Sequence, residues 1–224
     1  LSVAKHFPGH GDTAEDSHYT LPAVHHDRAR LDSVELLPFK RYIYDGYAGV
    51  MTGHLYVPAL DKARNKPVSM SRAVVTDLLQ KELGFRGLCF TDALAMKGAT
   101  TRKSDNPSVM ALLAGNDILL APAAPINDFA AVKEALEEGI LDREEIEAKI
   151  IKILQYKYIA GLNDYRPVET RGLSERLNSP HAAWLAAKLN EEAITLLKNE
   201  GDIIPLKQLD KKKIAALSIG DGVG

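Results

Sequence analysis

The feature that most constrains the fold is an alternation of short apolar runs with amphipathic helical patterns. The runs are four to seven residues long and show no strict polar–apolar alternation, as expected for strands buried on both faces. The sequence predicts four such strands, at Leu1–Phe7, Ala48–Thr52, Leu88–Thr91 and Ile118–Ala121. Strand–helix alternation of this kind is typical of a parallel sheet in an α/β fold.

Helical patterns lie between and after these runs. Ser71 is a suitable N-cap for one helix and Gly84 a suitable stop for it. Asp142 followed by Glu145 is a variant of the capping box that opens another. The predicted helices span residues 38–44, 71–83, 128–138, 143–159 and 181–198.

The number of strand–helix units indicates part of a larger fold. Four units fill residues 1–160, whereas a (β/α)₈ TIM barrel needs eight units and about 250 residues. The sequence therefore predicts the C-terminal half of such a barrel, in a chain that resembles a fragment because it begins abruptly and without Met. A half barrel has exposed strand edges, so we expect the missing first half, or another chain, to complete the fold.

The remainder of the chain predicts a linker and a second domain. Glycine and proline residues interrupt any long element between residues 161 and 180, which is typical of a linker. Residues 181–224 then combine a helical pattern with the apolar run Ile214–Ile219. We expect this segment to be the beginning of a C-terminal α/β sandwich domain.

Composition narrows the classes of function. The 224 residues carry a formal net charge of −2 without a strongly basic region, so neither nucleic acid nor a membrane surface is an expected partner. No apolar run approaches the ~18 residues of a membrane span. Cys89 is the only cysteine, so no internal disulfide forms and the fold does not depend on oxidation. Localisation stays open between the cytoplasm and the periplasm.

Polar side chains concentrate directly after the first predicted strand, at residues 5–18. Proline and glycine residues indicate a tight loop, and in a parallel barrel the loops after the strands build the active site. Asp16 and His18 are two positions apart, so in an extended segment their side chains point the same way and can hydrogen-bond. Such a pair orients the imidazole and suits proton exchange near neutral pH. On spacing alone, a surface pair without function explains the pattern equally well.

Asp92 ends the apolar run Leu88–Thr91 and is the second candidate for chemistry. A carboxylate at a strand end faces the mouth of a barrel, where desolvation is costly and usually serves a purpose. The alternative is an N-cap of the next helix. His54 also follows a strand, and either lines the same mouth or is structural, which we favour. His25 and His26 lie in a polar turn and are expected to be solvated.

The residues around these candidates resemble glycoside hydrolase family 3, specifically its bacterial β-N-acetylglucosaminidase branch. The resemblance rests on Lys5-His6-Phe7-Pro8-Gly9-His10-Gly11, Asp16-Ser17-His18 and Thr91-Asp92-Ala93-Leu94-Ala95-Met96. It covers roughly residues 1–160, and residues 191–206 are similar to the start of the family's second domain.

The resemblance implies a retaining glycosidase that needs no metal or other cofactor. Asp92 matches the nucleophile, and His18 matches the acid/base, held by Asp16 in a dyad. Lys5 and His6 match residues that bind N-acetylglucosamine. The implied substrates are bacterial peptidoglycan fragments, the muropeptides that contain β-linked N-acetylglucosamine. A histidine proton donor also leaves phosphorolysis open as an alternative to hydrolysis.

Two further interpretations of the residues stay open. One is a metal-dependent hydrolase, because the loop contains the ligand types His6, His10, Asp12, Asp16 and His18. Their spacing, however, matches no recognised closed zinc pattern. The other is a non-catalytic, sugar-binding remnant, because half a barrel supplies only part of a site.

Overall fold

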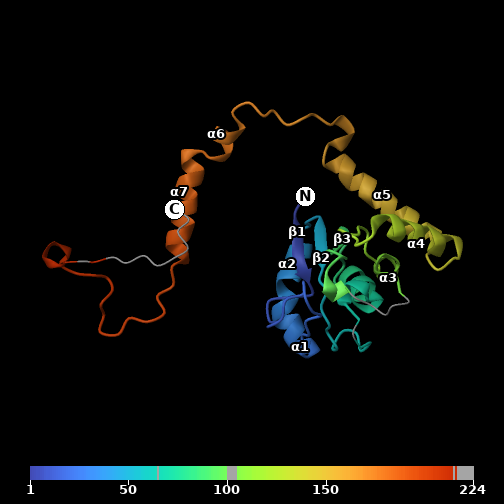
Figure 1. Cartoon of the computed structure of the whole chain (residues 1–224), viewed down its shortest axis with the longest axis horizontal. Coiled ribbons are helices and arrows are strands. Elements are labelled where there is room, and N and C mark those ends of the chain that lie inside the picture. The colour runs from blue at the N-terminus through green and yellow to red at the C-terminus, as the bar shows by residue number, and fades with distance from the viewer. Residues whose placement is uncertain (65, 100–104, 214, 216–224) are drawn as a thin grey trace. The chain divides into compact units, whose positions relative to one another are not determined.

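The computed structural model describes residues 1–64, 66–99, 105–213 and 215. The chain separates into two units, and the division falls between Tyr165 and Arg166, inside the segment with the composition of a linker. The helices and strands of both units are labelled in Figure 1.

A three-stranded parallel sheet, in the order β1-β2-β3, forms the centre of the first unit. Its strands are β1 (Val3–Phe7), β2 (Gly49–Thr52) and β3 (Leu88–Thr91). Three of the four predicted strands and their parallel direction are thereby confirmed. Val50 of β2 and Cys89 of β3 are fully buried, which agrees with strands covered on both faces.

The prediction of a fourth strand at Ile118–Ala121 is wrong. This segment forms only a single parallel bridge to Phe90 of β3. Strand pairing does not continue beyond Ile118, because the backbone N–H of Leu120 donates to the hydroxyl of Thr91 at 2.9 Å and not to a strand carbonyl. The carbonyl of Leu120 in turn accepts from the N–H of Leu94 at 2.9 Å, in the loop after β3. The segment therefore lies beside β3 and supports the loop that follows it.

Helices account for most of the remaining ordered structure of the first unit. They are α1 (Arg28–Arg30), η1 (Leu31–Glu35), α2 (Leu37–Tyr44), η2 (Val68–Met70), η3 (Ala73–Glu82), η4 (Lys97–Ala99), α3 (Pro107–Ala114), α4 (Pro125–Glu137), α5 (Arg143–Ile159) and η5 (Leu162–Asp164). Helix α5 has the predicted bounds, and the side chain of Asp142 caps it by accepting from the N–H of Glu145 at 3.0 Å. Helix α4 begins three residues earlier than predicted because Pro125 suits the first turn.

Two helices differ from the sequence prediction in an instructive way. Ser71 is not a side-chain cap of η3, a π-helix, because its hydroxyl donates to Asp61 Oδ2 at 2.5 Å. Helix α3 was not predicted. Its signals are Asn106, whose side chain accepts from two backbone N–H groups, and Gly115, which ends the helix with a φ of 115°.

The core of the first unit packs around the sheet and fixes the ends of its strands. Phe7, the last residue of β1, is fully buried and meets Phe39 of α2 edge-on, with 5.2 Å between ring centroids. Leu79 of η3 is also fully buried in this cluster. Figure 1 shows α2 beside β1. Burial of these side chains contributes roughly 1.5–3 kcal/mol each, so the position at which β1 ends is well determined.

The second unit contains α6 (Leu173–Leu177), α7 (Pro180–Ala193) and the short turn η6 (Leu209–Lys211). Ser179 caps α7 through the N–H of Ala182. The predicted end at Lys198 is wrong, since Ile194 is already extended and the β-branched pair Ile194 and Thr195 disfavours helix. The apolar run Ile214–Ile219, expected at the beginning of a second domain, lies outside the described residues, apart from residue 215.

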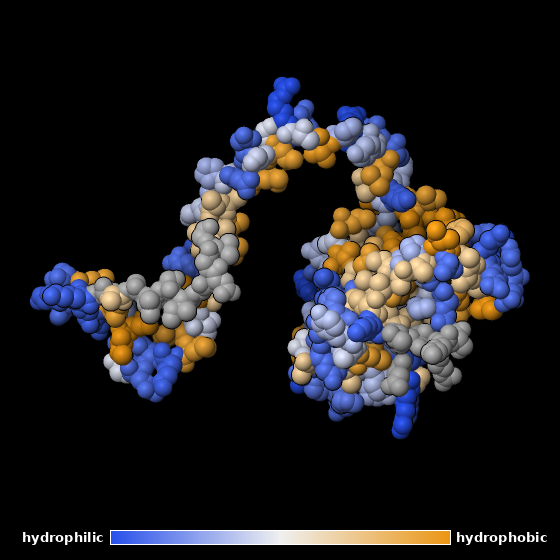
Figure 2. Space-filling view, viewed as in Figure 1, coloured by the Kyte–Doolittle hydropathy of each residue, from blue (hydrophilic) through white to orange (hydrophobic). Residues whose placement is uncertain are grey.

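Apolar side chains of the second unit are largely exposed (Figure 2). Trp184 of α7 and Leu197 are examples, with 59% and 92% of their surface accessible. No described helix of either unit combines the length and the apolar character that crossing a bilayer requires.

Candidate active site

The polar side chains that follow β1 and β3 converge at one edge of the sheet. Because the strands are parallel, their carboxyl ends lie at the same edge, on either side of β2. A cleft of about 340 Å³ opens there, lined by Lys5, His6, His10, Asp16, Ser17, His18 and Asp92. The fold therefore brings together all five residues that the sequence singles out for catalysis and sugar binding. His10 and Ser17 are additional.

Asp92 is held firmly at the end of β3. Its backbone N–H donates to the carbonyl of Thr52 at 3.0 Å, and its Oδ1 accepts from the N–H of Ala93 at 2.8 Å. The other oxygen, Oδ2, lies 3.4 Å from Nε2 of His6. Only 13% of the Asp92 side chain is exposed. Oδ1 accepts from the next residue and not from a helical turn, so these contacts do not support the N-cap interpretation.

His6 is the immediate neighbour of that carboxylate. Burial lowers the pKa of His6 from its ordinary value, and the attraction of Asp92 only partly opposes this shift. The positive charge of Lys5 lowers it further. The ring is therefore uncharged at neutral pH and can present an N–H of Nε2 to Asp92.

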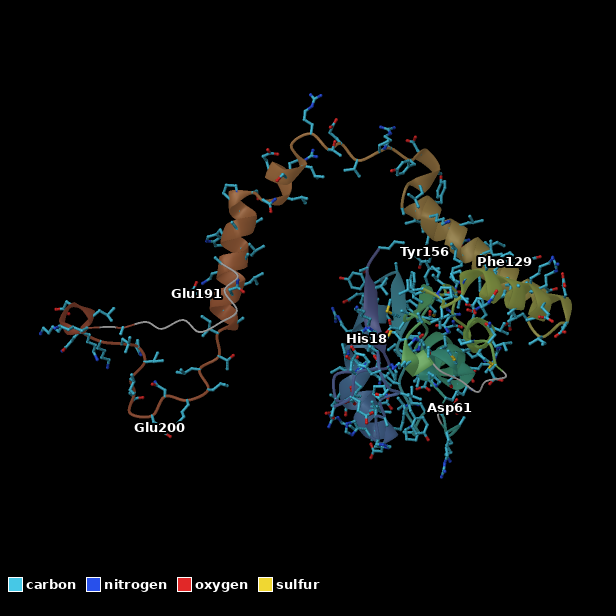
Figure 3. All side chains as sticks on the ribbon, viewed as in Figure 1. His18, Asp61, Phe129, Tyr156, Glu191 and Glu200 are labelled. Atoms are coloured by element: carbon cyan, nitrogen blue, oxygen red, sulfur yellow. The ribbon has the colours of Figure 1, made fainter. Side chains whose placement is uncertain are left out.

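Asp16 and His18 form the pair that their spacing predicts. Oδ1 of Asp16 accepts from Nδ1 of His18 at 2.7 Å and from the backbone N–H of His18 at 2.9 Å. These hydrogen bonds lower the pKa of Asp16. With Nδ1 bonded to the carboxylate, Nε2 is the ring nitrogen left for proton exchange. Figure 3 labels His18 among the side chains of the first unit.

His10 and Ser17 brace the loop that carries this pair. Nε2 of His10 lies 3.1 Å from the hydroxyl of Ser17, and Nδ1 lies 2.8 Å from the hydroxyl of Thr13. The carbonyl of Ser17 also accepts from the N–H of Gly98 in η4. Sequence reasoning placed His10 in the loop but gave no signal for this bracing, which depends on how the loop folds back.

The remaining histidines divide between structural and surface positions. His54 is fully buried, accepts from the hydroxyl of Ser69 at 2.8 Å and donates to the carbonyl of Ala93 at 3.1 Å, so it supports the turn after Asp92. Burial lowers its pKa. The favoured structural interpretation is thus right. His25 is exposed as expected.

His26 is only partly solvated, since 30% of its side chain is exposed. Its Nε2 lies 2.6 Å from Oδ2 of Asp12, because the loop after β1 folds back over the segment that carries His26. Among the described residues, Asp12, His26 and Glu35 are a group of three whose ligand-type atoms lie within 4.8 Å of one another. Of the five residues considered for a metal-dependent hydrolase, this group contains only Asp12.

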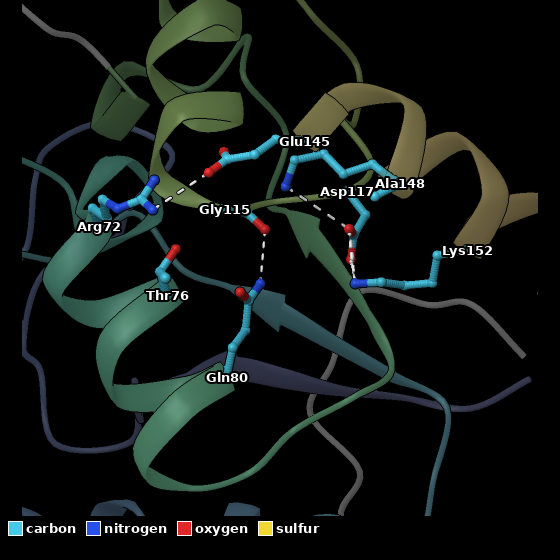
Figure 4. Close-up of a pocket in the computed structure, with 9 residues that line it drawn as sticks. Arg72, Thr76, Gln80, Gly115, Asp117, Glu145, Ala148 and Lys152 are labelled. Atoms are coloured by element: carbon cyan, nitrogen blue, oxygen red, sulfur yellow. Dashed lines mark hydrogen bonds and ion pairs between the residues drawn. The ribbon is translucent and has the colours of Figure 1, made fainter. Parts of the chain in front are cut away.

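A second cleft, of about 220 Å³, lies between η3 and α5 (Figure 4). Its charges are paired with one another: Asp117 lies 2.9 Å from Nζ of Lys152, and Arg72 lies 3.5 Å from Glu145. Asp117 also accepts from the backbone N–H of Cys89 at 2.8 Å. These contacts attach α5 to β3, which indicates a structural role for this cleft.

The fold and the first cleft define a class: an α/β domain whose parallel strands present a buried carboxylate and a carboxylate–imidazole pair at their carboxyl ends. Within that class, the chain belongs to glycosyl hydrolase family 3, because the model of the family's N-terminal domain matches residues 1–156. The resemblance seen in the sequence is thereby confirmed.

Individual relatives agree with this assignment. β-Hexosaminidase A of Pseudoalteromonas piscicida is 34% identical, over 99% of this chain and 39% of its own length. A family 3 β-N-acetylglucosaminidase from Paenibacillus sp. strain FPU-7 is 36% identical with a TM-score of 0.79, over 89% of this chain and 38% of its own. The β-glucoside phosphorylase BglX is 25% identical with a TM-score of 0.84, over 92% of this chain and 39% of its own. The chain spans about two-fifths of the length of these relatives.

Proposed function

We propose that the protein is a retaining β-N-acetylhexosaminidase in which Asp92 is the nucleophile and His18 the acid/base. The observation that carries this proposal is the convergence of Asp92 and the Asp16–His18 pair on one cleft. A retaining glycosidase needs a carboxylate nucleophile and a proton donor that act on the same glycosidic bond. Here the donor is an imidazole in place of the usual second carboxyl group.

The proposed first step forms a glycosyl–enzyme bond. A carboxylate oxygen of Asp92 attacks the anomeric carbon, and the bond to the leaving oxygen breaks as His18 delivers its Nε2 proton to that oxygen. In the second step His18 takes a proton from water, and the resulting hydroxide displaces Asp92 from the anomeric carbon. Two inversions give net retention and restore both residues.

The other lining residues have supporting roles in this proposal. Asp16 holds the ring of His18 and balances its charge when it is protonated, through the 2.7 Å hydrogen bond. Lys5 and His6 line the same cleft and carry N–H donors, which suits them to bind hydroxyl and acetamido oxygens of a sugar. A neutral His6 beside Asp92 leaves the nucleophile its charge.

We propose N-acetylglucosamine as the sugar that is released, and muropeptides as the substrates that contain it. The names of the relatives support the first part, since two of them are a β-hexosaminidase and a β-N-acetylglucosaminidase. The peptidoglycan origin rests on the resemblance of the loop string at residues 5–18 to the bacterial branch of the family.

A direct test uses chromogenic β-glycosides and a purified muropeptide. The purified protein should release N-acetylglucosamine from its aryl β-glycoside, and ¹H NMR should show the β-anomer of the sugar forming first. It should also release the sugar from the muropeptide. The α-anomer as first product would contradict retention, and sugar binding without turnover would favour the non-catalytic alternative.

A phosphorylase is the second candidate, and two observations favour it. The chain superposes on a β-glucoside phosphorylase with a TM-score of 0.84, and its candidate proton donor is a histidine, which does not repel an anion as a carboxylate would. Reaction in phosphate buffer with analysis for sugar 1-phosphate separates the two. Free sugar as the sole product at saturating phosphate would exclude this candidate.

A further inference from the structure

Three segments bring ligand-type side chains together outside the catalytic cleft. Asp12 belongs to the loop after β1, His26 to the segment that follows that loop, and Glu35 to the end of η1. One ligand atom from each lies within 4.8 Å of the other two, and Oδ2 of Asp12 is 2.6 Å from Nε2 of His26. None of the three lines the cleft that contains Asp92.

Glu35 gives the second, independent indication of a ligand. Only 6% of its side chain is exposed. Its Oε1 accepts from Arg30 at 3.1 Å, whereas its buried Oε2 has no hydrogen-bond partner among the described residues. The side chain also packs tightly against the loop, since a Cβ at Gly9 would lie 2.8 Å from the Cβ of Glu35. A buried carboxylate oxygen without a partner is costly, and a bound cation would remove that cost.

We propose that Asp12, His26 and Glu35 form a binding site for a divalent transition-metal ion, of which zinc is the best match. Zinc accepts imidazole nitrogen and carboxylate oxygen at about 2.0–2.2 Å, so a contraction of the present cluster places three ligands on one ion. Calcium and magnesium prefer ligand sets made only of oxygen. The ion fastens the loop that carries Asp16 and His18 to η1, and so acts on loop stability and not on the reaction itself. The proposal does not depend on the proposed function.

Arg30 competes with the ion for the same carboxylates. Its Nη2 lies 3.1 Å from Oε1 of Glu35 and 3.7 Å from Oδ2 of Asp12. The guanidinium thus supplies part of the positive charge that the cluster needs. Since 43% of the Arg30 side chain is exposed, it can turn into solvent when an ion enters. We therefore expect opposite effects on zinc affinity from substitutions of His26 and of Arg30.

The test is calorimetric titration of chelator-treated protein with zinc chloride. His26→Gln should weaken zinc binding by at least roughly tenfold, because a ligand is lost. Asp12→Asn, at an exposed position that the fold tolerates more easily, should do the same. Arg30→Gln should strengthen binding, because a competing cation is removed. The matched control is His25→Gln, which changes the neighbouring exposed histidine and should bind zinc as the unaltered protein does.

Thermal unfolding with and without zinc supplies a second measurement. Zinc should raise the Tm of the unaltered protein and of His25→Gln by the same amount, and should raise the Tm of His26→Gln by less. Equal affinity in His26→Gln and the unaltered protein would overturn the proposal. Zinc binding that is lost in His18→Gln but retained in His26→Gln would also overturn it, because the ion would then lie in the catalytic cleft. A protein that binds no zinc at millimolar concentration would overturn it as well.

Discussion

The nucleophile and the acid/base of the proposed site occupy two regions with contrasting support. Asp92 stands at the end of β3, where 13% of its side chain is exposed and its backbone and Oδ1 are both hydrogen-bonded. Asp16 and His18 lie on a loop, with 56% and 69% of their side chains exposed. The proposed nucleophile is thus anchored directly at the end of a strand, whereas the proposed acid/base lies on an exposed loop.

The contrast corresponds to what the two proposed roles require. A nucleophile gains from a fixed position, because an attacking atom misplaced by about 1 Å can cost roughly 10²-fold in rate. An acid/base must approach the leaving group in one step and water in the next, so a movable loop suits it. The hydrogen bonds of His10 and the carbonyl of Ser17 restrain that loop without burying the dyad.

The largest expected effect is at the proposed nucleophile. Asp92→Asn keeps the size of the side chain and its hydrogen bond to Ala93 but removes the nucleophile. We expect kcat for aryl β-N-acetylglucosaminides to fall by roughly 10⁴-fold or more, with an unchanged Tm. Rescue by azide, which would give the α-glycosyl azide, checks that the fold survives. A loss below tenfold would remove Asp92 from the role of nucleophile.

The next effect is at the loop and depends on the leaving group. His18→Ala should lower kcat/KM by roughly 10²-fold for a poor leaving group such as an alkyl alcohol or a sugar, because these need protonation. For dinitrophenol, which leaves without a proton, glycosylation should be nearly unchanged. Kinetics across a series of aryl leaving groups measures this. Equal losses for every leaving group would speak against His18 as the acid.

A smaller effect is expected from the residue that holds the imidazole. Asp16→Asn preserves an acceptor for Nδ1 of His18 and removes only the charge. Because both side chains are exposed, solvent screens their attraction, and we expect a loss in kcat/KM of roughly tenfold. A loss as large as that of His18→Ala would show that the dyad is buried during turnover, and so would weaken the contrast between the two regions.

The smallest expected effect is at His54, which supports the turn after Asp92, and it is an effect on the free energy of unfolding. Burial lowers the pKa of His54 from the ordinary 6.5, so below pH 6.5 the unfolded chain takes up a proton before the folded one. The free energy of unfolding should therefore fall as pH drops from 6.5 towards the folded pKa, and level off above pH 7. Urea unfolding at several pH values measures this. His54→Gln should be less stable throughout and should show a shallower pH dependence, whereas an identical slope would assign it to other groups such as His6.

The positions of the candidate catalytic residues can be predicted from the sequence because they follow from local rules, whereas their roles come from the family resemblance. Asp92 directly follows an apolar run, and Asp16 and His18 are two positions apart, so strand periodicity and loop position suffice to bring them to one edge. The same local rules gave the bounds of α5, whose cap at Asp142 is adjacent in sequence.

The misses share a dependence on contacts that are distant in sequence. Ser71 donates to Asp61 in place of capping a helix, and His26 pairs with Asp12, fourteen positions away. The segment Ile118–Ala121 is apolar enough for a strand, but the hydroxyl of Thr91 takes one of its N–H groups. The sequence pattern of a single segment does not predict hydrogen bonds to residues that are distant in the sequence. Helix α3 is different, since Asn106 and Gly115 were signals present in the sequence.

The proposed mechanism requires that Asp92 forms a covalent bond to the sugar. The most direct measurement is incubation with an activated fluorosugar that slows the second step, followed by proteolysis and mass spectrometry of the peptides. We expect one glycosyl adduct, on the peptide that contains Asp92, and no adduct in Asp92→Asn. An adduct on another carboxylate such as Asp16, or turnover of the natural substrate without any trappable adduct, would contradict it.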